Sequence, residues 1–190
     1  MTNSIKAYVD GSYYHDKHRY GFGCILIEPN QMVTIAGGSH DYKKVKNHRN
    51  VTGEILGSVY AVINAIKKGY KHIDLYYDYL GIEMWATKKW KRNYPLTDDY
   101  CKFMSEASKY IEIAFHKVKG HSGDFFNEKV DIIAKEAVSN KVPMPPFDIE
   151  CIVKDAKKSL PTLVSSFFFF IIQESSPYIY QPIFLYKMDL

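Results

Sequence analysis

The chain has 190 residues, of which 46% are hydrophobic and 24% are charged, and its formal net charge is +4. This length and composition suit a globular protein with one domain or one domain and an appendage. The three cysteines are isolated and odd in number, which argues against a disulfide framework or a thiolate zinc site, and the first residues lack a signal-peptide core, so we expect a cytoplasmic protein.

Alternating apolar and polar residues predict three consecutive strands at the start of the chain. The first spans residues 5–14 and places Tyr8 and Asp10 on the face opposite to its apolar residues. The second and third span residues 20–29 and 32–40. These three strands should form an antiparallel meander.

From Asn50 the apolar spacing becomes that of a helix, which Gly69 ends. The remaining expected elements are a strand at 71–78, a short helix at 79–87, a helix from Thr97, whose hydroxyl would cap it, a strand at 111–118 and a helix at about 126–139. Together these elements predict an α/β fold with a mixed five-stranded sheet, its first three strands antiparallel and helices on both faces.

The composition changes after about Lys141, where a proline cluster precedes an apolar region. We therefore expect a folded domain at 1–141 and an apolar extension at 142–190. The run FFFFII, residues 167–172, is too short to span a membrane. Three interpretations of the extension stay open: strands that pack on the domain, a docking segment for a protein partner, or a poorly ordered appendage.

Carboxylates occupy the ends of strands and helices that should meet at one edge of the sheet. Asp10 ends the first strand, Glu54 lies near the start of the first long helix and Asp78 ends the fourth strand, while Asp131 lies on the last helix. Carboxylates that converge in this way repel one another unless cations lie among them. Two divalent cations bound there could catalyse hydrolysis of a phosphodiester.

Four segments carry a family resemblance: YVDGS, NVTGEILGSVYAV, LYYDYLGIEMWA and VKGHSGDFFNEKVDIIAKEA. In this order they resemble the motifs of type 1 ribonuclease H, closest to the short bacterial form that is sometimes fused to a viroplasmin-like module, over about residues 4–139. The resemblance implies an endonuclease that cuts the RNA strand of RNA–DNA hybrids with two Mg²⁺ ions (Mn²⁺ as an alternative), leaving 5′-phosphate and 3′-hydroxyl ends. We expect a monomer.

Position by position, the resemblance implies that Asp10, Glu54, Asp78 and Asp131 bind the metal ions. It makes His121, on a glycine loop, the residue that assists proton movement and product departure. Asn50 would read the RNA strand from the minor groove. Asn127 matches an asparagine near the catalytic helix, although an asparagine near a helix start can simply cap it.

The chain departs from the family pattern at two positions that adjoin the site. Arg49 stands where relatives often have a threonine that grips the DNA phosphate, and Tyr79 stands where a serine is common. Neither change removes an expected metal ligand. They bear on the contacts to the DNA strand.

A basic and aromatic run at 85–93 is the expected substrate contact outside the carboxylates, with Trp85 as suited to the core as to the substrate. The residues predicted to bind the hybrid there are Lys88, Lys89, Trp90, Lys91 and Arg92. A second basic run, 42–49, is as compatible with a solvated surface as with phosphate binding.

Two other functions compete with hybrid cleavage. Another nuclease with the ribonuclease H-like fold would share the carboxylates but not the glycine-histidine loop or Asn50. A non-catalytic nucleic-acid binding module would be expected to lack one of the four acids, and all four are present.

Overall fold

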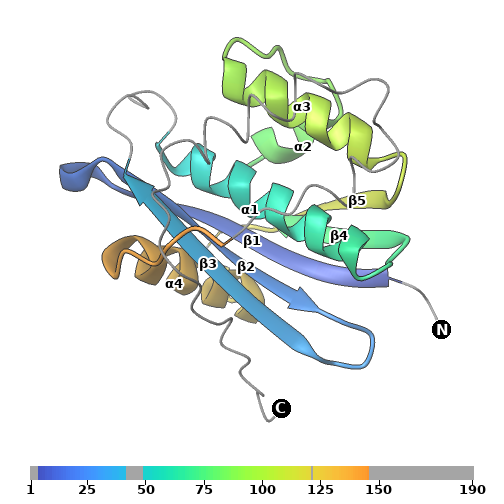
Figure 1. Cartoon of the computed structure of the whole chain (residues 1–190), viewed down its shortest axis with the longest axis horizontal. Helices are drawn as coiled ribbons and strands as arrows, with labels where there is room; N and C mark the ends of the chain where they lie inside the picture. The colour runs from blue at the N-terminus through green and yellow to red at the C-terminus, as the bar shows by residue number, and fades with distance from the viewer. Residues whose placement is uncertain (1–3, 42–48, 121, 146–190) are drawn as a thin grey trace.

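The structure is a computed structural model that describes residues 4–41, 49–120 and 122–145, and for Arg49 and Asn50 it describes the backbone alone. Five strands form one sheet in the order β3-β2-β1-β4-β5 (Figure 1). The strands are β1 (Ser4–Tyr14), β2 (Arg19–Ile27), β3 (Val33–Asp41), β4 (His72–Tyr77) and β5 (Glu112–Lys117). β1, β2 and β3 pair antiparallel, whereas β1, β4 and β5 pair parallel. The predicted mixed sheet is therefore confirmed.

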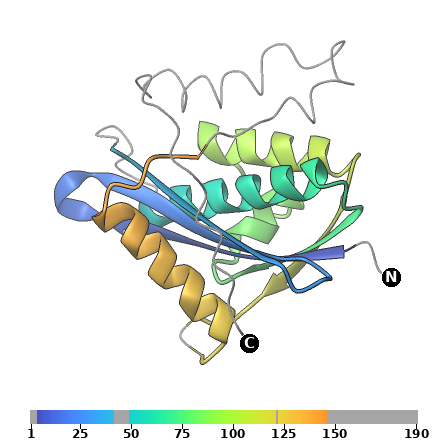
Figure 2. The ribbon, with the colours of Figure 1, turned by 60° about the horizontal axis from the view of Figure 1, so that its bottom comes forward.

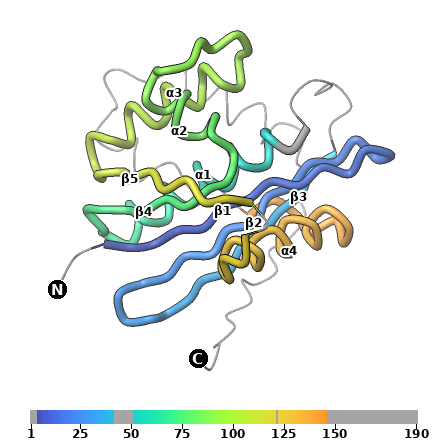
Figure 3. Tube along the Cα trace, turned by 180° about the vertical axis from the view of Figure 1, so that it is seen from behind, coloured from blue at the N-terminus to red at the C-terminus, as the bar shows by residue number. Residues whose placement is uncertain are grey.

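Helices cover both faces of this sheet, as expected. The helices are α1 (Arg49–Lys67), α2 (Gly81–Ala86), α3 (Pro95–Ala107) and α4 (Phe125–Ser139), and a short 3₁₀ helix, η1 (His15–Lys17), joins β1 to β2. Figure 2 shows α1 and α3 on one side of the sheet and α4 on the other. Seen from behind in Figure 3, α4 lies across the β2 side of the sheet, where it packs on β1, β2 and β3.

The main core lies between the sheet and the layer of α1 and α3. Its fully buried side chains include Phe22 of β2, Ile55 of α1 and Leu75 of β4. A smaller apolar cluster under α4 contains Tyr8 and Val130. Within the described parts of the chain, no helix has both the length and the hydropathy needed to cross a membrane.

A glycine on α1 sets the distance between this helix and the sheet. A Cβ atom added at Gly53 would lie 2.0 Å from the carbonyl oxygen of Gly21 on β2, far closer than real Cβ contacts. Only glycine therefore lets α1 approach so closely. The next residue is Glu54, which is placed directly against the strands.

Two positions expected at element ends differ from the structure. β1 ends at Tyr14, in agreement with the expected range of 5–14, so Asp10 lies within the strand and not at its end. The antiparallel pairing of β1 with β2 extends to Tyr14, while its parallel pairing with β4 stops at Tyr8. Thr97 does not cap α3, which begins at Pro95, a residue whose fixed φ suits the first helical position. The Thr97 hydroxyl instead donates to the carbonyl oxygen of Tyr94, at 3.0 Å.

After α4 the chain stays on the domain beyond the expected boundary at 141. The backbone N–H and the hydroxyl of Ser39 both donate to the carbonyl oxygen of Val142, at 2.7 and 3.0 Å. Met144 packs against the main core, and Pro145 lies so close to Gly38 that a Cβ there would be 2.6 Å away. In Figure 2 this orange segment rises from the α4 layer to the α1 layer. Residues 146–190 lie outside the described residues.

Candidate active site

Three of the four expected carboxylates converge where β1 and β4 separate. Asp10 lies two residues beyond the last β1–β4 pair, Asp78 directly follows β4, and Glu54 reaches the strands from α1. One carboxylate oxygen from each of them lies within 4.8 Å of the other two. Asp10 is 8% exposed and Glu54 is 5% exposed, whereas Asp78 is half-buried.

Burial and mutual repulsion act strongly on these acids. Burial raises the pKa of Asp10 to about 7, and the charge of Asp78 contributes to the rise, although the backbone N–H of Gly11 donates to Oδ1 of Asp10 at 2.6 Å. Burial raises the pKa of Glu54 to about 9, and the charges of Asp78 and Asp10 add to that rise. Both shifts arise because an ionised carboxylate is costly in a buried site beside other anions.

The donor set fits a divalent cation. Carboxylate oxygens are the hard ligands that Mg²⁺ and Mn²⁺ prefer. Among buried side-chain nitrogen and oxygen atoms of the described residues, Oε2 of Glu54 alone lacks a hydrogen-bond partner. Such an orphaned oxygen is costly unless a cation or a donor meets it. Asp10, Glu54 and Asp78 are therefore suited to hold a divalent cation.

Asp131 lies on α4 and is not part of this group of three. Its charge reaches Asp10 and contributes to the raised pKa of that residue. Oδ2 of Asp131 is paired with Nζ of Lys135, one helical turn further along α4, at 2.6 Å. Asp131 therefore borders the cluster while its carboxylate already has a cationic partner.

The glycine-histidine loop begins beside the cluster. A Cβ atom at Gly120 would lie 3.0 Å from Oδ2 of Asp78. His121 itself lies outside the described residues. After the loop, Asp124 caps α4 by accepting a hydrogen bond from the backbone N–H of Asn127, at 2.9 Å, and Asn127 is buried. The cap of α4 is therefore Asp124, and Asn127 lies inside the helix.

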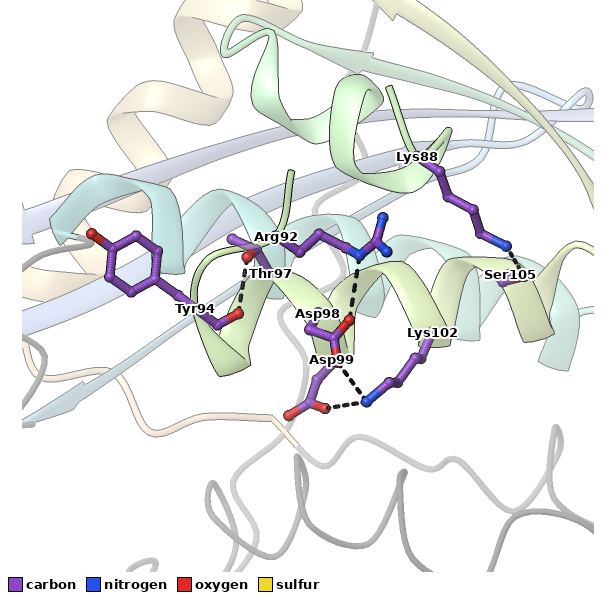
Figure 4. A network of polar contacts seen from close by, with 8 residues as sticks. All are labelled: Lys88, Arg92, Tyr94, Thr97, Asp98, Asp99, Lys102 and Ser105. Carbon is purple, nitrogen blue, oxygen red and sulfur yellow. Dashed lines mark hydrogen bonds and ion pairs between the residues drawn. The ribbon is translucent and has the colours of Figure 1, made fainter. Parts of the chain in front are cut away.

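The expected basic contact at 85–93 is largely tied to the protein itself. Lys89 pairs with Glu83 at 3.2 Å and Arg92 pairs with Asp98 at 3.3 Å. Nζ of Lys88 is 3.4 Å from Oγ of Ser105, and Figure 4 shows this contact beside the Arg92 pair. These three cations are thus partly neutralised or held along α2 and α3.

Two residues of the same run remain open to a ligand. Lys91 is exposed, and across residues 4–41, 49–120 and 122–145 it has no hydrogen bond or ion pair. Trp90 is 39% exposed and meets Trp85 edge to face, whereas Trp85 is 9% exposed and belongs to the core. The side chains of Arg49 and Asn50 lie outside the described residues, although both residues begin α1.

Two contacts at the site were not expected from the sequence. Lys135 is one helical turn from Asp131, and the spacing of four residues on a helix could have indicated the pair. Tyr79 donates a backbone hydrogen bond to the Glu54 carboxylate. No sequence pattern marks that bond, because it depends on how α1 lies against the end of β4.

Comparison with known proteins gives the family. Residues 2–139 match the family model described as RNase H. A curated protein named Ribonuclease H from Ehrlichia ruminantium is 31% identical over 150 residues, which cover 72% of this chain and 95% of that protein. One with the same name from Pseudoalteromonas translucida is 30% identical, covering 74% of this chain and 94% of its own length.

Solved structures show the same fold. The RNase H1 of Halobacterium salinarum has a TM-score of 0.58 at 21% identity, over 72% of this chain and 98% of its own. LC11-RNase H1, solved in complex with an RNA/DNA hybrid, also has a TM-score of 0.58, at 13% identity, over 72% of this chain and 97% of its own. With a family match over most of its length and relatives of the same name, the chain belongs to the ribonuclease H family of enzymes.

Proposed function

We propose that this protein hydrolyses the RNA strand of RNA–DNA hybrids as an endonuclease and leaves 5′-phosphate and 3′-hydroxyl ends. The observation that carries the proposal is the convergence of Asp10, Glu54 and Asp78, with pKa values of Asp10 and Glu54 raised to about 7 and about 9. Acids arranged in this way are found where catalysis needs concentrated negative charge.

The carboxylates would hold divalent cations, with Mg²⁺ as the expected ion and Mn²⁺ as the alternative. When bound, two such ions supply an activated water and stabilise negative charge on the reacting phosphate. Asp10, Glu54 and Asp78 would provide the preformed ligand set. Asp131 would join it after its carboxylate exchanges Lys135 for a cation.

The residues around the carboxylates would bind and orient the hybrid. Lys91 has no ion pair within the described residues and Trp90 has an exposed ring, so they are the first candidates to contact the phosphates and sugars of one strand. Lys88, Lys89 and Arg92 would contribute mainly by fixing that run and by their summed charge.

For the remaining predicted residues, we propose the roles that the family resemblance implies. Asn50 would read the RNA strand through its 2′-hydroxyls, which distinguish RNA from DNA. Arg49 would approach the DNA phosphate, and Asn127 would support the catalytic helix. His121 would take and release protons at the leaving product.

An assay with end-labelled RNA tests the proposal. The same RNA would be offered as a hybrid with DNA, as an RNA duplex and as a single strand, first with Mg²⁺ and then with EDTA. We expect internal cleavage of the hybrid alone, and only with Mg²⁺. Hybrid binding without cleavage would indicate a binding module, and equal cleavage of a DNA duplex would indicate a different nuclease of this fold.

A further inference from the structure

Tyr79 directly follows Asp78 and contacts the carboxylate cluster through its backbone. Its backbone N–H donates a hydrogen bond to the Glu54 carboxylate. Tyr79 is therefore a neighbour of Glu54 in the structure, although the two residues come from different elements of the chain.

The ring of Tyr79 begins a row of aromatic side chains that runs from the carboxylates to the surface. Its centroid is 5.7 Å from that of Trp85, and Trp85 is 5.9 Å from Trp90. Trp85 is 9% exposed, and Trp90 is 39% exposed. The row thus leads from the residue whose backbone binds Glu54 to the exposed Trp90 in the basic run.

The geometry at Gly81 holds the ring of Tyr79 in this row. A Cβ atom at position 81 would lie 2.3 Å from Cε1 of Tyr79 and 2.7 Å from Cζ3 of Trp85. The backbone N–H of Ile82 also donates to the carbonyl oxygen of Tyr79, at 3.1 Å. Because no side chain fits at position 81, the start of α2 serves as a tight floor for both rings.

The outer end of the row is fixed as well. The hydroxyl of Tyr77, the last residue of β4, donates to Oε2 of Glu83 at 2.7 Å, and Oε1 of Glu83 pairs with Lys89 at 3.2 Å. The backbone N–H groups of Lys89 and Trp90 both donate to the carbonyl oxygen of Met84, at 2.8 and 3.0 Å. The end of β4, α2 and the basic run are thereby tied together.

We propose that Tyr79 is a positioning residue for ion binding: its ring, packed against Trp85 at the start of α2, fixes the backbone N–H that orients Glu54 toward Asp10 and Asp78. The inference rests on the proposed function, because it takes Glu54 as an ion ligand. Groups that orient a ligand matter nearly as much as the ligand itself. Without the ring, the segment that carries the N–H at position 79 loses its packing, and the carboxylate of Glu54 loses its fixed orientation.

The first test measures Mg²⁺ binding to the full chain by calorimetry, without nucleic acid. We expect Tyr79→Ala to weaken Mg²⁺ binding by about tenfold or more, the usual effect of removing a group that orients a metal ligand. Tyr79→Phe keeps the ring and should bind within about twofold of the wild type, on the same reasoning. Tyr94→Ala removes a 44% exposed tyrosine before α3 and is the matched control, which should bind Mg²⁺ as the wild type does.

The second test needs no substitution at Tyr79. The chain has two tryptophans, and both belong to the aromatic row, so Trp90→Phe leaves Trp85 as the sole tryptophan reporter. Mg²⁺ should change Trp85 fluorescence in this variant and should leave it unchanged when Glu54→Gln is added. An unchanged Trp85 signal in a protein that calorimetry shows to bind Mg²⁺ would overturn the proposal, even if Tyr79→Ala proved unable to fold.

The outcomes separate this inference from the proposed function. If the wild type neither binds Mg²⁺ nor cleaves hybrids, the proposed function fails. If the wild type does both and Tyr79→Ala binds Mg²⁺ as tightly as the wild type, only the role of Tyr79 fails. Equal losses in Tyr79→Phe and Tyr79→Ala would likewise overturn it, since they would assign the effect to the hydroxyl and not to the ring.

Discussion

Asp10 and Glu54 are acids whose ionised forms are disfavoured by the fold, and a bound cation would favour those forms. Both are buried, both lie beside other carboxylates, and one oxygen of Glu54 has no hydrogen-bond partner among the described residues. A cation bound there relieves the repulsion and satisfies the oxygen at once. At the scale of single residues, the charge of each acid therefore matters more than its shape.

Replacing Asp10 with Asn tests this statement, since the amide keeps the size of the side chain and removes its charge. We expect hybrid cleavage to fall by about 10²–10³-fold or more, as when a charge-stabilising group is removed. Hybrid binding, measured by fluorescence anisotropy with Mg²⁺ present, should stay within a few-fold of the wild type. Asp16→Asn, at an exposed position in η1, is the control and should cleave normally. Cleavage by Asp10→Asn near the wild-type rate would contradict the ion-binding role.

At the scale of elements, two groups of charged residues have different partners. One is the basic run in the loop after α2, and the other surrounds Asp74 on β1, β4 and β5. In the loop, Lys88, Lys89 and Arg92 each contact a side chain of α2 or α3. Lys91 has no such contact within the described residues. On the sheet, β1, β4 and β5 share a polar cluster centred on Asp74, which accepts hydrogen bonds from Ser4 at 3.1 Å and from His116 at 2.7 Å. We expect the loop charges to affect hybrid binding and the Asp74 cluster to affect the stability of the fold.

For the loop, the salt dependence of hybrid binding distinguishes lysines that bind phosphate from lysines that pair internally. Removing one lysine that binds a phosphate should lower the slope of log K against log salt by about 0.9 for a duplex. We expect Lys91→Ala to lower it by about one such step, and Lys89→Ala by less, because Lys89 already pairs with Glu83. Alanine at positions 88, 89, 91 and 92 together should flatten the slope most and leave the maximal rate nearly intact.

Lys102→Ala serves as the control for the loop, since Lys102 pairs with Asp98 at 2.6 Å on α3. The slope should not change in this variant. A slope unaffected by the fourfold substitution would mean that the run is a solvated surface and not a binding site.

For the sheet, Asp74 should make stability depend on pH. Burial alone would raise its pKa, but hydrogen bonds from His116, Ser4 and His72 outweigh burial and lower it. Because the folded-state pKa lies below the ordinary value of about 4, this group stabilises the fold above that value, and the effect disappears as the pH falls through the folded pKa. Asp74→Asn should therefore reduce the free energy of unfolding by about 1–2 kcal/mol at pH 6, and by much less near pH 3.

Urea unfolding of both proteins at these two pH values measures the difference. Asp99 is a control of opposite sign, because burial raises its pKa, and the repulsion from Asp98 adds to the rise against the attraction of Lys102. Asp99→Asn should not lose stability at pH 6. A stability difference for Asp74→Asn that stays the same at both pH values would exclude a role for its charge.

At the scale of the whole molecule, the position where the domain ends decides what a truncation does. Val142 accepts two hydrogen bonds from Ser39, and Met144 packs against the main core. A chain that ends at residue 141 lacks these hydrogen bonds and this packing, whereas one that ends at residue 145 keeps them. We therefore propose that a stable fragment extends to about residue 145, a few residues beyond the boundary expected from composition.

We predict that residues 1–145 unfold and cleave hybrids like the full chain, and that residues 1–141 are less stable by about 2 kcal/mol, the scale of losing a partly buried methionine side chain and its neighbouring hydrogen bonds. Urea unfolding and the hybrid assay measure both properties. The full chain should scatter more light at matched concentration, because its apolar, Phe-rich extension favours association. A fragment of residues 1–145 that fails to fold would show that the extension belongs to the domain.

Most of the architecture and the convergence of three expected carboxylates could be predicted from local patterns. The spacing of apolar residues predicts the antiparallel strands β1, β2 and β3. The positions of Asp10, Glu54 and Asp78 near the ends of their elements predict that these three side chains meet. What could not be predicted depends on three-dimensional contact, such as the Tyr79 hydrogen bond to Glu54. The ion-pair partners of Asp131 and of the basic run could not be predicted, because a charged residue in the sequence does not show which residue neutralises it.

The central place of β1 has a consequence for how the enzyme comes into being. β1 can pair with β2 as soon as their hairpin exists, but its other neighbour, β4, arrives only after the whole of α1 has been made. Such distant parallel pairing is the slow kind of event in folding. The three carboxylates meet only when that crossover closes, so nascent and partly folded chains have no complete site for a cation. The proposed ion site can therefore be complete only after β1 and β4 have paired.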